Sequence, residues 1–179
     1  MIKVAVVVGS LRKDSINLKF AKALEKLAQG KMTFSFVSIG DLPLFNQDLE
    51  SDVPASVKKL KADIEGADAV LFVTPEYNRG LPGVLKNAID WASRPYGSNS
   101  WGGKPAAICG ASPGAIGTAV AQAQLRAMSG FLDFKMMGQP EVYFTWKEGV
   151  IADDGSVTDE RTKGFLQGFV DKFAAFAAG

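Results

Sequence analysis

The sequence predicts an α/β fold, in which a parallel β-sheet is covered by helices on both faces. Short apolar runs alternate along the chain with longer segments of helical periodicity, the pattern of parallel strands joined by crossover helices. The first run, residues 4–8, is apolar without interruption, as in a strand that is buried on both faces. A chain of 179 residues with 47% apolar composition suits one compact domain, so we expect residues 1–179 to fold as a single unit.

Each element follows from a local pattern. Ser15 precedes an apolar-periodic segment that ends near Leu27, which predicts a capped first helix. Pro54 suits the first turn of a helix that runs to about Glu65, and Thr158 is placed to cap the last helix. The other expected strands cover residues 33–39, 67–74 and 104–110 and a region between residues 134 and 146, and the other expected helices cover residues 83–93 and 114–129. Five strands and five helices in this alternation predict a flavodoxin-like, doubly wound parallel sheet of strand order 2-1-3-4-5, flanked by helices.

The loop after the first strand carries the residue types of an anion site. It leads into the N-terminus of the first helix, where free backbone N–H groups and the helix dipole attract negative charge. Its polar side chains are those of Ser10, Arg12, Ser15 and Asn17. Neither Arg12 nor Asn17 is expected in the core.

Which anion the loop binds depends on its glycines. Only Gly9 stands where a dinucleotide fingerprint needs three glycines, and the glycine-rich triphosphate loop is also absent. Hydroxyls in place of glycines favour a compact terminal monophosphate, such as that of flavin mononucleotide (FMN). A capped helix without any ligand gives the same local pattern and is the alternative.

Two further loops should meet this one, because the carboxyl ends of parallel strands lie at one edge of the sheet. The second loop is bracketed by Pro75 and Pro82, which leave its backbone groups free to read the polar edge of a flat heterocycle. In this loop Tyr77 offers an aromatic surface, and Asn78 offers a paired donor and acceptor. The third loop covers residues 110–114. A rigid turn without a ligand is the alternative for the second loop.

Composition excludes several classes of protein. Twenty basic and 19 acidic residues give a net charge of +1 with no long run of one sign, which argues against nucleic-acid binding. No apolar stretch approaches the roughly 20 residues of a membrane span. Lys3 interrupts the N-terminal run, so we expect no signal peptide, no membrane association and a cytoplasmic location.

The chain has no histidine and a single cysteine, which restricts its chemistry. Ser-His-Asp and Cys-His catalysis and histidine-ligated metal sites are ruled out, and no metal site is expected. Any enzymatic chemistry would then have to use carboxylates, Lys, Tyr, the thiol or a cofactor. Hydride transfer through a flavin fits well, because the flavin does the electronic work and the protein positions it.

Four segments of the chain together carry a resemblance to a known family: residues 9–12 with Ser15 and Asn17, residues 42–46, residues 75–78 and residues 85–91. They resemble the NADPH-dependent FMN reductase family, and within it the bacterial quinone and chromate reductases, and the likeness covers residues 4–133 in the same order. The resemblance implies a tightly held FMN, with NADPH or NADH as cosubstrate. It also implies hydride transfer through FMN N5 to quinones, without a catalytic side chain, and with chromate, ferric complexes, azo compounds and free flavin as further acceptors. Because both substrates would share one face of the flavin, we expect ping-pong kinetics.

The resemblance also assigns roles to single residues. It implies that the FMN phosphate is held by Ser10, Arg12, Ser15 and Asn17, with Ile16 and Leu18 lining it. It implies that the isoalloxazine ring is lined by Pro75, Glu76, Tyr77 and Asn78, with Ser112 close to it. Two other kinds of protein stay open, a flavodoxin-like electron carrier without substrate turnover and a flavin-less α/β module that binds a nucleotide or phosphosugar. A carrier usually presents a strongly acidic face, which the net charge of +1 does not favour.

The fourth expected helix indicates self-association. Residues 115–128 leave almost no polar face, although a helix that covers a sheet on one side only should keep a polar stripe. We therefore expect a homodimer or homotetramer through this helix and the third helix. The third helix would contribute Leu85, Ile89 and Trp91. The related reductases use an Arg and a Tyr in polar contacts between subunits, and Val120 and Ala123 stand there in this chain, which puts a tetramer of that kind in doubt.

Three other features have simple structural interpretations. Cys109 lies in a strand pattern and is expected in the core, because buried thiols behave as small apolar groups. Trp101 either lies over a substrate entrance or is an ordinary surface aromatic. Residues 153–155 form a surface turn rather than a calcium loop, since the repeated acidic ligands are missing.

Overall fold

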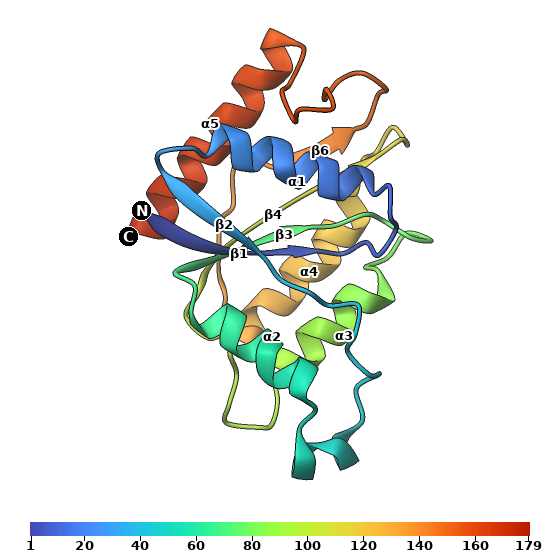
Figure 1. Cartoon of the computed structure of the whole chain (residues 1–179), viewed down its shortest axis with the longest axis vertical. Coiled ribbons are helices and arrows are strands. Elements are labelled where there is room, and N and C mark those ends of the chain that lie inside the picture. Colours follow the sequence, from blue (N-terminus) through green and yellow to red (C-terminus); the bar gives the residue numbers. More distant parts are fainter.

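A six-stranded parallel sheet runs through the middle of the molecule with helices on both faces, in a computed structural model that describes residues 1–179 (Figure 1). The strands are β1 (Ile2–Val8), β2 (Met32–Phe36), β3 (Ala69–Val73), β4 (Pro105–Ser112), β5 (Lys135–Met136) and β6 (Val142–Thr145). The helices are α1 (Ile16–Leu27), α2 (Ala55–Glu65), α3 (Gly83–Ala92), α4 (Ala119–Leu132) and α5 (Glu160–Ala178), with a short 3₁₀ helix η1 (Gln47–Asp52). The strand order β2-β1-β3-β4-β5 confirms the predicted order.

The expected fifth strand is divided into two short strands. β5 pairs with the start of β4, at residues 105–106, and β6 pairs with its end, at residues 109–112. Gly138 and Pro140 lie between them, and proline has no N–H to donate to the ladder. The chain therefore leaves the sheet here and returns, so that β6 flanks the carboxyl end of β4.

The α4 helix begins at Ala119, later than the expected residue 114. The preceding residues 115–118 form a turn that includes Gly117, whose φ of +58° is a left-handed conformation. A Cβ on Gly117 would lie 2.7 Å from the carbonyl carbon of Tyr143, so the turn also needs glycine in order to pack against β6.

The caps at the helix N-termini agree with the sequence in one case and differ in another. The Ser15 hydroxyl accepts a hydrogen bond from the Leu18 N–H at 3.2 Å, which confirms the predicted cap of α1. The cap of α5 is Asp159, whose carboxylate accepts from the Thr162 N–H at 2.7 Å. The prediction of Thr158 as this cap was wrong, because its hydroxyl donates instead to the Gly149 carbonyl at 2.8 Å.

Two hydrophobic clusters fill the space between the sheet and its helices. A cluster of 24 buried residues lies between the sheet and the α1–α5 layer, and a cluster of 21 lies between the sheet and the layer of α2, α3 and α4. Figure 1 shows these two helical layers on opposite sides of the strands. Cys109 belongs to the first cluster, as predicted.

Several aromatic and apolar side chains are more deeply buried than expected. Trp101 is fully buried, with its ring centroid 5.6 Å from that of Phe72 and its indole N–H bonded to the Ile89 carbonyl at 3.0 Å. Both predictions for Trp101, an entrance residue and a surface aromatic, were therefore wrong. Leu85, Ile89 and Trp91 are buried within the protomer, which places Trp91 in the core, and an interface through their helix stays a prediction.

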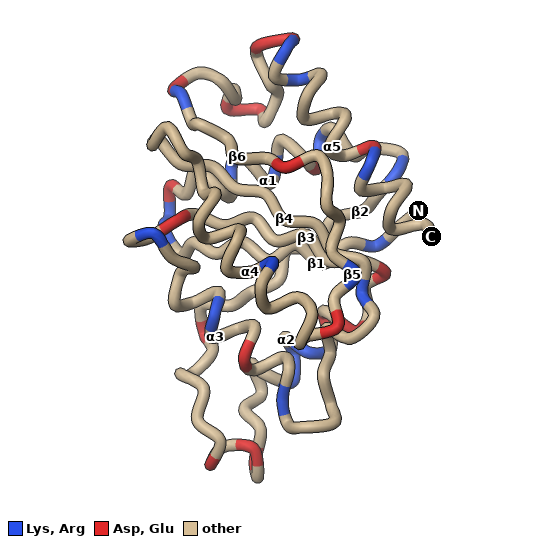
Figure 2. Tube along the Cα trace, turned by 180° about the vertical axis from the view of Figure 1, so that it is seen from behind, with Lys and Arg blue, Asp and Glu red and all other residues tan.

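The surface charges are mixed. Figure 2 shows Lys and Arg interspersed with Asp and Glu over the trace. None of the helices has the length and apolar character needed to cross a membrane.

Candidate functional site

Three loops meet at the carboxyl ends of β1, β3 and β4. We call them the Ser10 loop (residues 9–15), the Tyr77 loop (residues 74–82) and the Gly117 loop (residues 113–118). The first two pack closely because Gly9 has no side chain: a Cβ there would lie 3.0 Å from Leu85 Cδ2 and 3.3 Å from Pro75 Cδ. The predicted convergence of the first two loops is confirmed, but residues 110–112 of the predicted third loop belong to β4, so the third loop begins at Pro113.

The Ser10 loop presents a row of unused backbone donors. Among residues 10–15, only the N–H of Arg12 finds an acceptor within the chain, the Ser10 hydroxyl at 3.4 Å. The loop enters α1, whose first N–H groups also lack helical acceptors, and Arg12 itself is exposed. Donors at a helix N-terminus beside a guanidinium fit a phosphate dianion.

Asn17 has a structural task that the sequence did not reveal. Its side chain is buried, its amide nitrogen donates to the Ala111 carbonyl at 2.9 Å, and its amide oxygen accepts from the Ala111 N–H at 2.9 Å. The expectation that Asn17 lies outside the core was wrong, whereas Arg12 is exposed as expected. Asn17 ties the start of α1 to β4 and leaves its backbone N–H for a ligand.

The Tyr77 loop folds as a tight hairpin. Tyr77 and Gly80 exchange backbone hydrogen bonds of 3.2 and 2.9 Å, and the two residues between them have positive φ, 52° at Asn78 and 59° at Arg79. This is the two-residue type I′ turn, which asparagine tolerates well and which costs arginine about 1–2 kcal/mol. The turn fixes the hairpin and leaves the N–H groups of Asn78 and Arg79 without acceptors in the chain.

A cavity of about 230 Å³ lies between the Tyr77 loop and the Gly117 loop. Its lining residues are Glu76, Asn78, Arg79, Ser112, Gly114, Ile116 and Gly117. The structure therefore brings together three of the predicted ring residues, Glu76, Asn78 and Ser112. Pro75 is buried beneath them, and Tyr77 is 51% exposed and does not line the cavity.

Sequence reasoning missed the contribution of the Gly117 loop and of α4. Glu76 does not only line the cavity, because one of its carboxylate oxygens accepts hydrogen bonds from the N–H groups of Val120 and Ala121 at 2.9 and 3.1 Å. Gln124 of α4 accepts from the Leu81 N–H at 2.8 Å. Gly117 was the one signal in the sequence that this loop packs closely, since a Cβ on it would lie 2.7 Å from the carbonyl carbon of Tyr143.

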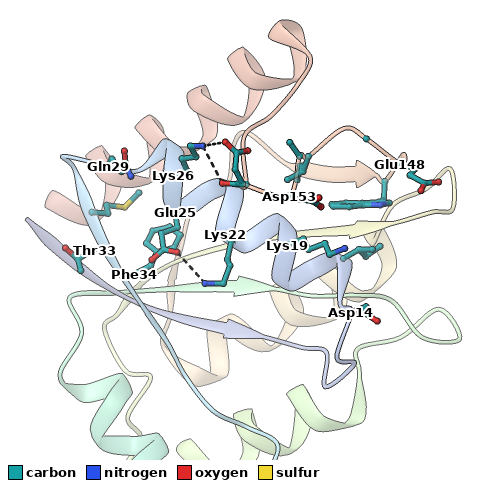
Figure 3. Close-up of a pocket in the computed structure, with 18 of the residues that line it drawn as sticks. Asp14, Lys19, Lys22, Glu25, Lys26, Gln29, Thr33, Phe34, Glu148 and Asp153 are labelled. Carbon is teal, nitrogen blue, oxygen red and sulfur yellow. Dashed lines mark hydrogen bonds and ion pairs between the residues drawn. The ribbon is translucent and has the colours of Figure 1, made fainter.

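A second, larger groove runs along the outer face of α1. Figure 3 shows Lys19, Lys22 and Lys26 of α1 along it, with Lys26 bound to Asp154 at 2.9 Å. The groove has a volume of about 1280 Å³ and includes only Arg12 and Ile16 among the predicted site residues. Its lining mixes lysines with carboxylates and therefore does not single out one kind of ligand.

Two of the segments that resemble the reductase family are hydrogen-bonded to each other. The Asn87 side chain accepts from the Phe45 N–H at 2.7 Å and donates to the Pro43 carbonyl at 2.9 Å. The Trp91 indole N–H donates to the same carbonyl at 2.8 Å. These hydrogen bonds join the segment at residues 42–46 to the segment at residues 85–91.

Comparisons with known proteins agree with this arrangement. The sequence profile of the family described as NADPH-dependent FMN reductase matches residues 2–148. The chain is 54% identical over 175 residues to a 2-hydroxy-1,4-benzoquinone reductase of Burkholderia sp., covering 98% of this chain and 96% of that protein. It is 51% identical over 174 residues to a quinone reductase of Pseudomonas putida, covering 97% of this chain and 93% of that protein.

A solved structure also matches the fold of this chain along nearly its whole length. FerB from Paracoccus denitrificans, a flavoenzyme NAD(P)H:(acceptor) oxidoreductase, matches with a TM-score of 0.97 and 57% sequence identity, over 99% of this chain and 98% of that chain. The resemblance that the sequence motifs predicted is confirmed, together with FMN and NAD(P)H as the cofactors it implied. The chain belongs to the NADPH-dependent FMN reductase family.

Proposed function

We propose that the chain is an FMN-dependent NAD(P)H:quinone oxidoreductase. The observation that carries this proposal is that the carboxyl edge of the sheet holds both the Ser10 loop with its unused donors and, between the Tyr77 loop and the Gly117 loop, a cavity of about 230 Å³. The names of the relatives from Burkholderia and Pseudomonas putida support quinones as acceptors. Chromate, ferric complexes, azo compounds and free flavin are further acceptors to be tested.

In this proposal the FMN phosphate lies at the N-terminus of α1. The Ser10 and Ser15 hydroxyls, the Arg12 guanidinium and the unused N–H groups of the Ser10 loop bind it, and hydrogen bonds to a charged group contribute about 1.5–3 kcal/mol each. Asn17 contributes through its backbone N–H, because its side chain is bound to Ala111. Ile16 and Leu18, which are half-buried at the start of α1, flank the phosphate.

The isoalloxazine ring lies between the Tyr77 loop and the Gly117 loop. In this proposal Glu76, Asn78 and Ser112 line the ring from the cavity, and Pro75 and Tyr77, which do not line the cavity, contact the ring at its border. The free N–H groups of Asn78 and Arg79 supply donors to the polar edge of the ring. Bound FMN supplies the two-electron redox chemistry, so the side chains need only bind the ring, orient it and stabilise charge.

The two half-reactions test this function separately. Anaerobic NADPH should bleach the flavin absorbance of the purified protein, and later addition of 1,4-benzoquinone should restore it. Initial rates at several fixed quinone concentrations should give parallel double-reciprocal lines, the pattern of ping-pong kinetics. A protein that binds no FMN, or a flavin that NADPH alone does not bleach, would contradict the proposal, and the second result would favour an electron carrier.

We further propose that the protein is a homodimer through α4, with a homotetramer as a second possible assembly. One face of this helix carries exposed small residues, Ala123, Ala127 and Gly130, beside Phe131, whose side chain is 88% exposed. Small residues let a second helix approach closely, and a large exposed aromatic is stabilised by burial. The face of α3 that points away from the core carries the Lys86–Asp90 ion pair instead.

We also propose that the enzyme works in the cytoplasm. Its expected electron donor, NAD(P)H, is a cytoplasmic metabolite. The single cysteine is buried and free, which suits a reducing compartment.

A further inference from the structure

Glu76 is a buried carboxylate at the border of the proposed ring site. Its side chain is only 5% exposed, and its two oxygens have different partners. One oxygen accepts from the N–H groups of Val120 and Ala121 at 2.9 and 3.1 Å, and the other accepts from the Arg79 guanidinium at 3.1 Å. The carboxylate therefore joins the Tyr77 loop to the first turn of α4.

The first turn of α4 depends on this contact because it has no cap of its own. Thr118 occupies the N-cap position, but its hydroxyl makes no capping hydrogen bond and accepts from the Gln122 amide at 2.9 Å. The first turn of a helix carries free N–H groups and a partial positive charge, which an anionic side chain stabilises. Glu76 supplies that anion from another loop, across the wall of the cavity.

A second contact between the same two elements lies next to Glu76. Gln124 accepts from the Leu81 N–H at 2.8 Å and donates to the Arg79 carbonyl at 3.4 Å. Arg79 has a left-handed φ of 59°, a strained conformation for arginine that these contacts hold in place. The hairpin is thus tied to α4 at both of its ends.

We propose that Glu76 is a positioning residue, which sets the spacing between the Tyr77 loop and the Gly117 loop and thereby the fit of the isoalloxazine ring. This inference rests on the proposed function. The carboxylate also places a negative charge in the cavity wall, where it opposes the gain of negative charge by a reduced flavin. It acts through the loops and not as a catalytic acid or base, since its oxygens are bound to backbone N–H groups and Arg79.

The test compares Glu76→Gln with Glu76→Asp, using apoprotein titrated with FMN and with riboflavin. In Glu76→Gln the dissociation constants for both flavins should rise by the same factor, about tenfold, because the ring site is affected and the phosphate site is not. The reduction potential of bound FMN should become more positive, since a neutral amide replaces the anion. Glu76→Asp should keep the potential of the parent, because its charge is kept, but should also bind both flavins more weakly, because its shorter side chain does not reach α4.

Glu50→Gln is the matched control, because Glu50 is also a largely buried carboxylate that binds an arginine, Arg94, at 2.6 Å, but lies outside the three loops. It should leave both flavin affinities and the potential unchanged. If Glu76→Gln lowers only the thermal stability of the apoprotein and leaves affinities and potential as in the parent, Glu76 is a helix cap alone and the proposal is wrong. If Glu76→Gln does not fold, the FMN and riboflavin affinities of Glu76→Asp test the proposal instead. Weaker binding of both flavins supports it, and affinities equal to those of the parent contradict it. A parent protein that binds no FMN would overturn the proposed function instead.

Discussion

Asn17 uses both ends of its amide to join α1 to β4. The Ala111 N–H and carbonyl that it satisfies are buried inside the protein. A buried polar backbone group without a partner costs about 1–3 kcal/mol. The Asn17 side chain therefore stabilises the fold whether or not a ligand is bound.

Asn17→Ala should therefore destabilise the protein. We expect a loss of about 2–4 kcal/mol in the free energy of unfolding, because two buried backbone groups lose their partner. Denaturant unfolding of the apoprotein measures this, with Asn46→Ala as a control, since Asn46 is exposed and caps only η1. An apoprotein as stable as the parent would show that the Asn17–Ala111 pair contributes nothing.

Cys109 should be inert in the native protein. Burial raises the pKa of its thiol, so the neutral thiol is favoured in the folded state. The unfolded pKa is about 8.5, so this contribution to stability is full below that pH and is lost as the pH rises above it. At pH 8 a thiol reagent should label the native protein about a thousandfold more slowly than the unfolded chain. Equal labelling rates would contradict the burial of the thiol.

At the residue scale, sequence patterns predicted roles that depend on local chain geometry. Ser15 was identified as a cap because a cap is defined by its own neighbours. Trp101 and Asn17 were misplaced because their surroundings come from segments distant in sequence, Phe72 and Phe134 in one case and Ala111 in the other. The binding roles of the predicted site residues stay predictions.

At the scale of elements, α3 both covers the sheet and holds the loop before η1. Asn87 and Trp91 together make three hydrogen bonds to the backbone of Pro43 and Phe45. Phe45 also packs edge-on against Trp91, with ring centroids 5.0 Å apart. The loop at residues 42–46 is therefore fixed by side chains and not by secondary structure of its own.

Asn87→Ala should release this loop. Phe45 N–H loses its acceptor, so amide hydrogen exchange should become faster at residues 43–52 and stay unchanged in β1 and β3. The free energy of unfolding should fall by about 1–3 kcal/mol. Exchange in this loop that equals the parent's would mean that Trp91 alone holds it.

The boundaries of elements were harder to predict than their existence. The start of α4 was placed too early because residues 114–118 continue the apolar pattern of the helix, although Gly117 must take a left-handed turn against Tyr143. The division of the edge strand into β5 and β6 depends on pairing with β4, and Pro140 was its one local signal. Such features are decided by contacts between elements.

At the scale of the whole molecule, the strand order could be predicted because few topologies satisfy the rules. Right-handed crossovers and an alternating strand–helix sequence leave the doubly wound sheet as the natural arrangement for five apolar strands. The order placed three loops at one edge and so located the candidate site. How the loops are tied together, through Glu76 and Gln124, could not be predicted from the order alone.

Self-association through α4 is tested by Ala127→Glu. A charge on the exposed small-residue face should raise the dimer dissociation constant at least about tenfold, because a buried unpaired carboxylate is costly. Sedimentation analysis measures this, and Ala62→Glu, the same change at an exposed position of α2, should have no effect. A monomeric parent at micromolar concentration, or an Ala127→Glu protein that assembles like the parent, would contradict the α4 interface.

The central claim is that the Ser10 loop binds the phosphate of FMN, and calorimetric titration of the apoprotein with FMN and with riboflavin tests it most directly. Riboflavin lacks the phosphate, so it should bind the parent far more weakly than FMN. Arg12→Ala should weaken FMN binding about ten- to a hundredfold while leaving riboflavin binding nearly unchanged, because about 1.4 kcal/mol corresponds to a factor of ten. The variant should also stay folded, since Arg12 is exposed. Riboflavin that binds the parent as tightly as FMN would contradict the claim.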